Sequence, residues 1–362
     1  MFTIAGAVLA LALQTAPAPG GLGEAYHAFL QGRVLESRGD ITGAVAAYKR
    51  AIALAPTASG PHAELAGVYA RAGRATESIA EAEAALVLDR ADREAHRILG
   101  LVQAALADNA ADGARRTQLT NDAIGHLEQA LAGARDPGAE LTLGRLTLGA
   151  NRLARAIEVL RNFLYDNPGY PEGVMLLTEA FERNGQIAEA VATLEPEAGR
   201  GRLDAPEAVS ALAELYERAG RWSDAAARWG AVYAKSQDPE ARMRQASALI
   251  NAGQVTAGRD LAAAIVADRP RDPAGLYLLA QAERRAGHAD AAEAAANKLR
   301  ELDPADPRGP LSLAEVFEAR VEERAQHADH TEKVLARLED LGERKGPARI
   351  GRIEFAQLVG GG

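Results

Sequence analysis

The side chains with the greatest potential for chemistry in this sequence are its seven histidines, because the chain contains no cysteine. The absence of cysteine excludes disulfides, cysteine-ligated zinc, iron–sulfur clusters and thiol catalysis. His327 and His330 have a spacing that could place two imidazoles on one helical face, with Asp329 between them. A metal site needs three or four ligands in a closed shell, and no further histidine accompanies this pair. We therefore predict no metal site and no cofactor.

Sequence motifs for catalysis are also missing. The chain contains no G-x-x-x-x-G-K-[ST] phosphate loop, no G-x-S-x-G nucleophile turn and no H-E-x-x-H metal motif. Adjacent carboxylates such as Glu322 and Glu323 are typical of a solvated helix face and do not indicate acid–base chemistry. The residues outside the repeats described below are too few to form a catalytic domain. We predict a protein that is not an enzyme.

The composition limits both the fold and the partners. Of the 362 residues, 48% are hydrophobic, which excludes a disordered chain, but only 4% are aromatic, which argues against a large β-sandwich or barrel. The formal net charge of −9 disfavours the basic surface that nucleic-acid binding requires. We expect no nucleic-acid partner.

The N-terminal segment, residues 1–20, contains an uncharged apolar run over residues 2–13. A helix of that length would rise only ~18 Å, which is too short to span a bilayer. Its length fits the apolar region of a secretory signal peptide, and Ala16-Pro17-Ala18 is a candidate cleavage motif. Against export, no Lys or Arg precedes the run, and Pro19 follows the motif. We predict a periplasmic or secreted protein without an integral membrane span after removal of this leader, with a cytoplasmic protein as the alternative.

The rest of the chain consists of a repeat of about 34 residues. Segments such as GDITGAVAAYKRAIALAP (39–56) and GRATESIAEAEAALVLDR (73–90) align on a glycine between two amphipathic patterns. Each unit is therefore predicted to be two short helices joined by a glycine turn, usually closed by proline. Nine units are expected, with first helices that begin near residues 25, 59, 93, 137, 171, 206, 239, 273 and 307.

The pattern of small and aromatic residues resembles the tetratricopeptide repeat family. In the second unit Leu65, Ala66 and Tyr69 stand at that family's Leu, Gly and Tyr positions of the first helix. The first unit matches the second helix of the family motif with Ala44, Tyr48, Ala51 and Pro56, and the sixth unit follows both patterns with Leu212, Ala213, Tyr216, Ala225 and Trp229. The resemblance implies an all-α, right-handed α-solenoid over residues 25–340, in which stacked units supply the core that no single unit could bury alone. His62 and His96 share one position in successive units and are expected to line the core.

Four segments depart from the regular repeat. In the third unit we expect helices at 93–106 and 118–132, separated by an exposed loop over 107–117. In the fifth unit Pro196 is expected to end the second helix near Leu194–Glu195. The ninth unit lacks the glycine turn, so its first helix is expected to run to about 328, with a further helix at 331–341. Residues 341–362 form a tail that would cap the last unit through Ile350, Ile353, Phe355 and Leu358.

The surface that we expect to bind a partner is the inner one, lined by the first helices. The fifth residue of most units is apolar although this position should face a groove, and the charge changes from basic to acidic along the surface. The alternative is a solvated inner wall whose apolar residues pack on neighbouring helices. The candidate groove residues are Phe29, Arg33, Arg71, Arg97, Leu141, Arg145, Met175, Glu179, Glu182, Glu214, Glu217, Met243, Tyr277 and Leu311.

The resemblance implies a scaffold or adaptor that binds a protein or peptide segment in the concave groove. By analogy with bacterial repeat scaffolds, we expect a role in assembly or export at the cell envelope. The alternative is a structural subunit that docks permanently in a larger complex through its ends and its apolar tail. Neither the identity of the partner nor the oligomeric state is encoded in a recognisable motif.

Overall fold

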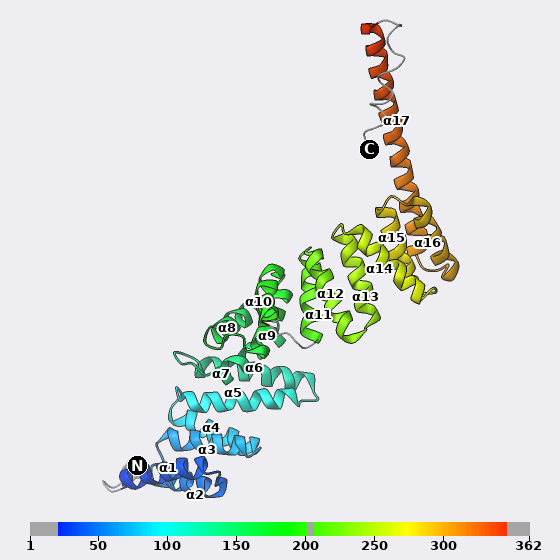
Figure 1. Ribbon diagram of the computed structural model, residues 1–362. Helices are drawn as coiled ribbons and strands as arrows, with labels where there is room; N and C mark the ends of the chain where they lie inside the picture. Colours follow the sequence, from blue (N-terminus) through cyan, green and yellow to red (C-terminus); the bar gives the residue numbers. More distant parts are fainter. Residues whose placement is uncertain (1–20, 201–205, 346–362) are drawn as a thin grey trace, which may run out of the picture. The chain divides into compact units, whose positions relative to one another are not determined.

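The computed structural model describes residues 21–200 and 206–345, and this part of the chain folds into α-helices without any strand (Figure 1). The expected all-α solenoid of paired helices is confirmed. The contacts divide the chain into two compact bodies, which meet in sequence at residue 200. The first body contains α1 (Gly21–Ser37), α2 (Ile41–Leu54), α3 (Ser59–Arg71), α4 (Ala75–Leu88), α5 (Arg93–Asp108), α6 (Gly113–Ala130), α7 (Pro137–Gly149), α8 (Leu153–Asp166), α9 (Pro171–Arg183) and α10 (Ile187–Gly199). The second contains α11 (Pro206–Arg218), α12 (Trp222–Ser236), α13 (Pro239–Asn251), α14 (Val255–Asp268), α15 (Pro273–Arg285), α16 (Ala289–Leu302) and α17 (Arg308–Lys345).

The turns inside the helical pairs depend on residues that adopt a left-handed backbone. Gly39, Gly73 and the glycines at 185, 220, 253 and 287 all have φ between 70° and 78°. This conformation, which a side chain disfavours, lets the chain reverse directly after the first helix. In the fourth pair Asn151 takes the same role with φ 58°. The glycine spacing in the sequence is therefore the spacing of the turns.

The links between pairs are fixed by aspartates that cap the next helix. Asp136, Asp238 and Asp272 each accept a hydrogen bond from a backbone N–H in the first turn of the following helix, and each is followed by proline at the first helical position. Proline has no N–H to lose there, and its fixed φ suits the start of a helix. These signals explain why α7, α13 and α15 begin at residues 137, 239 and 273.

The helices form two layers within each body. The odd-numbered helices α3, α5, α7 and α9 contact one another in series, as do α13, α15 and α17. The even-numbered helices chiefly contact the odd-numbered helices next to them in sequence within the same body. The core lies between the layers and is built from alanine, leucine and a few large aromatic side chains, among them Tyr48, Tyr216 and Trp229. Small residues allow the helices to approach closely around these larger ones.

The prediction of a long loop over 107–117 is wrong. Helix α5 extends to Asp108 and α6 already begins at Gly113, so only residues 109–112 lie outside helices. The physical reason is Asp112, whose carboxylate accepts hydrogen bonds from the N–H groups of Ala114 and Arg115 and so caps a longer α6.

The expected early end of the second helix in the fifth unit is also wrong. Pro196 lies inside α10, which continues to Gly199. Proline in the last turn removes only one backbone hydrogen bond of the helix, and the turn gains an ion pair of 2.6 Å between the buried Glu197 and Arg200.

The ninth unit contains one continuous helix instead of the two that were expected. Helix α17 passes through residues 328–331 without a break and ends at Lys345. No glycine or proline occurs between Leu311 and Leu341. Asp329 and Lys333, which lie one turn apart on the helix, form an ion pair of 2.6 Å that stabilises it. The leader at 1–20 and the tail segment 346–362 lie outside the described residues. None of the described helices is both long enough and apolar enough to cross a membrane.

Candidate functional site

The candidate site is the exposed side of the odd-numbered helices, which we call the inner surface. It is formed by the fifth, ninth, twelfth and thirteenth residues of each unit, because these positions lie on one side of the first helix. The inner surface of each body is described separately below.

In the second body the inner surface carries an apolar row, formed by Met243, Tyr277 and Leu311. These residues lie 34 positions apart on α13, α15 and α17, three helices that contact one another. Leu276 and Leu278, on either side of Tyr277, are buried in the stack, whereas Tyr277 itself stays half-buried and Leu311 is 51% exposed. The row is therefore an accessible apolar surface that the neighbouring helices leave uncovered.

Polar contacts fix the middle of this row. The Gln281 side-chain amide donates a hydrogen bond of 2.6 Å to the Tyr277 hydroxyl, and the Arg308 guanidinium lies 5.7 Å from the centre of the Tyr277 ring. Met243 is half-buried and packs against the cluster around Ala246 and Ile250. Tyr277 and Leu311 are thus the more accessible members of the row.

The predicted apolar residues of the first body differ in how accessible they are. Phe29 packs edge-on against Tyr48, with ring centres 5.8 Å apart, and is half-buried. Leu141 is half-buried on α7, while Met175 on the adjacent α9 is 37% exposed. Met175 and Leu141 therefore form the accessible apolar part of this inner surface.

Most of the predicted groove arginines hold the first body together. Arg71 bonds to Glu36 at the end of the preceding odd-numbered helix, and Arg145 bonds to Asp108 in the same way at 3.0 Å. Arg97 is held by Glu94 at 2.6 Å, and this hydrogen-bonded carboxylate raises the pKa of the guanidinium. Three arginines that the sequence suggested as partner contacts are therefore engaged by acidic side chains of the chain itself.

Arg33 differs from these arginines. It is exposed on α1 and makes no hydrogen bond with any described residue, but its charge acts on the nearby Glu64. Burial raises the pKa of the Glu64 carboxyl, and Arg33 partly opposes that change. Glu64 was not among the predicted site residues, because a single glutamate in an amphipathic helix carries no recognisable signal.

The predicted acidic residues are also engaged within the chain. Glu179 pairs with Arg183 at 3.3 Å on α9, and the half-buried Glu182 lies one turn further along the same helix. In the second body Glu214 pairs with Arg244 at 2.8 Å, and Glu217 accepts a 2.7 Å hydrogen bond from the Trp229 indole. Glu217 is therefore a structural partner of the core, since it satisfies the one polar atom of a buried ring.

The sequence contains a signal for the ion pairs of Arg71 and Arg145. The arginine and its acidic partner lie about one repeat apart, 35 residues for Arg71 and Glu36 and 37 for Arg145 and Asp108. Residues separated by one repeat length face each other across adjacent odd-numbered helices. Opposite charges at that separation therefore predict a bridge rather than a free charge.

The histidines form one contact that the sequence did not reveal. His96 is buried, as expected, and its Nδ1 lies 2.8 Å from Nδ1 of His126 on α6. His62 is partly buried and contacts Glu81 at 2.7 Å. Within the described residues no three His, Asp or Glu side chains converge as metal ligands would, and the His327 side chain lies outside the described set.

Comparison with known proteins decides the family. The family model described as tetratricopeptide repeat matches residues 8–59, 141–196, 175–242 and 243–307, which together exceed half of the chain. The chain belongs to the tetratricopeptide repeat family. Tetratricopeptide repeats are interaction scaffolds and are generally non-enzymatic. No curated protein matches the sequence.

Three solved structures are similar to this chain, each with a TM-score below 0.5. The MamA protein is 23% identical and covers 50% of this chain and 96% of its own, with a TM-score of 0.40. A tetratricopeptide repeat protein from Parabacteroides merdae is 12% identical over 82% of this chain and 99% of its own, with a TM-score of 0.41. PilW, titled a type IV pilus biogenesis factor, is 14% identical to this chain. The match covers 58% of this chain and 93% of PilW, with a TM-score of 0.41.

Proposed function

We propose that this tetratricopeptide repeat protein is a scaffold that binds an extended or helical polypeptide segment on its inner surface. The observation that carries the proposal is the row of Met243, Tyr277 and Leu311, which offers apolar side chains at the same place on three consecutive odd-numbered helices. A segment laid along the row would bury apolar surface at each step, worth roughly 25 cal/mol per Å². Beside Met243, the ion pair of Arg244 with Glu214 is formed before binding, which reduces the entropy lost on association.

The location that we propose for this activity is the bacterial cell envelope. The proposal is supported by the apolar run at residues 2–13 and the Ala16-Pro17-Ala18 motif, which together have the pattern of an export signal. N-terminal sequencing of the protein purified from its native cells tests the location. A mature chain that begins near residue 19 would support it, and one that retains residues 2–13 in the cytoplasm would contradict it.

The binding proposal is tested by selecting peptides from a display library against the full chain and measuring their affinity by calorimetry. Leu311→Glu places a charge at the exposed end of the apolar row, and we expect at least a ten-fold loss of affinity with an unchanged circular dichroism melt. Ala294→Glu is the matched control, because Ala294 is exposed on α16, in the other layer. Selected peptides that bind both variants equally well would show that the inner surface of the second body is not the binding site.

A further inference from the structure

The helical pairs of this protein share a socket, formed where a small residue of the first helix receives a large side chain of the second. A Cβ added to Gly32 would lie 2.7 Å from the Tyr48 ring, and one added to Gly100 or Gly144 would collide in the same way with Leu127 or Leu160. Gly32, Gly100 and Gly144 all occupy the eighth position of their units. The eighth position is therefore the place where the second helix of a pair seats its large residue.

The second helices carry a matching pattern. In the first and third units alanine, a large residue and alanine recur with the same spacing, as Ala44, Tyr48 and Ala51 and as Ala123, Leu127 and Ala130. All six side chains are buried. A helix that fits the socket therefore carries a small residue, a large apolar residue four positions later, and another small residue three positions after that.

Helix α17 has the socket, but among the described residues no second helix follows it. Ala314 follows Ala246 and Ala280 at the same position of successive units; those two are buried, but Ala314 is exposed. On the same face of α17, Phe317 is 52% exposed and Val321 66% exposed. Helix α17 continues as one helix to Lys345, and within residues 21–200 and 206–345 no second helix covers this face. Among the odd-numbered helices described, α17 is the one that is not followed by a described partner helix.

We propose that Ala314, Phe317 and Val321 form a docking site for an amphipathic helix of a partner polypeptide, which takes the position that the second helix has in the other pairs. The occupant carries the small–large–small pattern of α2 and runs antiparallel to α17. At about 100° per residue, Ala314, Phe317 and Val321 point about 60°, 120° and 80° away from Leu311, so the centre of this site lies about a quarter turn from the inner surface. The proposal therefore adds a second binding surface to the inner surface.

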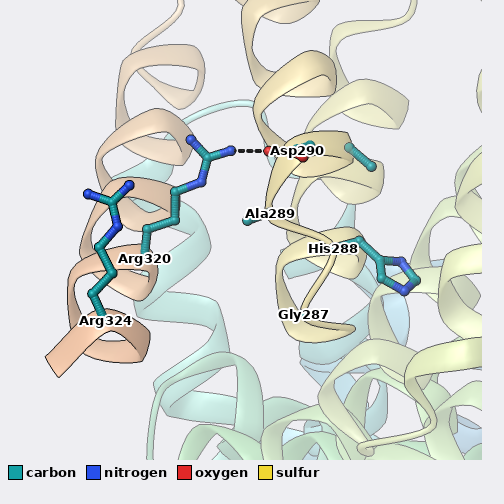
Figure 2. Close-up of a pocket in the computed structure, with 7 residues that line it drawn as sticks. Gly287, His288, Ala289, Asp290, Arg320 and Arg324 are labelled. Atoms are coloured by element: carbon teal, nitrogen blue, oxygen red, sulfur yellow. Dashed lines mark hydrogen bonds and ion pairs between the residues drawn. The ribbon is translucent and has the colours of Figure 1, made fainter. Parts of the chain in front are cut away.

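The charges beside the socket define the occupant further. Arg320 reaches from α17 to Asp290 at the N-terminus of α16 and to Glu293 at 2.7 Å, next to a cleft of about 540 Å³ (Figure 2). Arg324, one turn further along α17, forms no ion pair with a described residue. An antiparallel partner helix would begin near Arg324. An acidic residue at its N-terminus would pair with this arginine and would also interact favourably with the positive end of the helix dipole. Asp40 provides an acidic residue at the N-terminus of α2, four residues before Ala44, where its carboxylate accepts a hydrogen bond from the Gly43 N–H.

The test uses a peptide of residues 40–56, which contains the α2 pattern, made helical by a cross-link between positions 46 and 50. Both positions are exposed on α2, so the cross-link leaves the docking face free. The labelled peptide is titrated with the full chain, and binding is followed by fluorescence anisotropy. We expect micromolar binding that weakens at least ten-fold with Phe317→Ser or with Ala314→Leu, which fills the socket. The same peptide with Tyr48→Glu should not bind.

Two control variants separate this site from others. Val87→Ser removes a similar exposed side chain from α4, and Leu311→Glu alters the inner surface; neither should affect the peptide. A helical peptide that fails to bind, or that binds Phe317→Ser as tightly as the native chain, would overturn the proposal. Sedimentation equilibrium supplies the other outcome: a dimer that Phe317→Ser dissociates would show that a second copy of the chain, not a partner helix, occupies this face.

Discussion

His96 and His126 share a contact in which only one proton can lie between the two rings. The Nε2 atom of His96 donates a hydrogen bond of 3.1 Å to the Arg90 carbonyl, so its Nδ1 must accept from His126 while His96 is neutral. Protonating both rings would place two N–H groups against each other. Burial lowers the pKa of His126, the His96 charge lowers it further, and Asp122 and Glu83 oppose the change.

This contact predicts that the first body loses stability in acid. Because its folded pKa is lowered, His126 binds a proton less readily in the folded chain than in the unfolded chain. The contribution of His126 to the free energy of unfolding is therefore fully present above the ordinary histidine pKa of about 6.5. It is lost as the pH falls through the lowered pKa that His126 has in the folded chain. We expect His126→Ala to reduce the difference between thermal melts at pH 7 and pH 5, and His27→Ala, an exposed residue on α1, to leave it unchanged. An equal pH dependence in all three proteins would contradict the assignment.

At the scale of elements, the turn glycines provide a direct test of the backbone argument. Gly73 has φ 71° and no atom near an added Cβ, so Gly73→Ala would cost only the left-handed strain, about 1–2 kcal/mol. Gly125 lies in the middle of α6 in equally open space with ordinary helical geometry, so Gly125→Ala should stabilise by about 0.5–1 kcal/mol. In chemical unfolding monitored by circular dichroism, the midpoint should therefore fall for Gly73→Ala and rise for Gly125→Ala, although both residues lie in the same body. Two shifts of the same sign would contradict the role of the turn.

The elements were predictable where a local signal repeats and were missed where a single residue decides. Turn glycines recur in six of the helical pairs and Asp-Pro starts at α7, α13 and α15, and the observed starts at 59, 93, 137, 171, 239 and 273 coincide with the repeat arithmetic. The cap residue Asp112 lies within a polar stretch that is typical of a loop, and Pro196 lies in the last turn of α10, where proline costs less than in a helix interior. In α17 the helix continues because nothing in the sequence stops it.

The site was less predictable than the fold because its side chains depend on contacts between units. Periodicity places Arg71 and Arg145 on the inner surface, but only the geometry shows that Glu36 and Asp108 already hold them. The same holds for Glu217, whose role depends on the depth of Trp229 in the core. The apolar row of Met243, Tyr277 and Leu311 remains a prediction from position, to which the structure adds the exposure of each member.

At the scale of the whole molecule, stability should be local, because helices of each body contact mainly their neighbours in sequence. Trp229 is a suitable probe. Its buried indole bonds to Glu217 on α11 and lies under the Arg244 guanidinium of α13 at 4.8 Å, so this one ring joins three helices. Replacing it with alanine opens a cavity and leaves the Glu217 carboxylate without its donor, at a cost of about 3–5 kcal/mol.

We expect hydrogen exchange in Trp229→Ala to rise strongly in α11 to α13, less in α14, and little in α16 and α17. In a cooperative globule the same substitution would raise exchange in every helix by a similar amount, because all of them would open together. The gradient should therefore follow the number of units that separate each helix from the cavity. Val232→Ala, one turn away on α12, serves as a smaller perturbation of the same unit and should give the same gradient at lower amplitude. A uniform increase across α11 to α17 would show that the second body unfolds as one cooperative block and that nearest-neighbour contacts do not govern its stability.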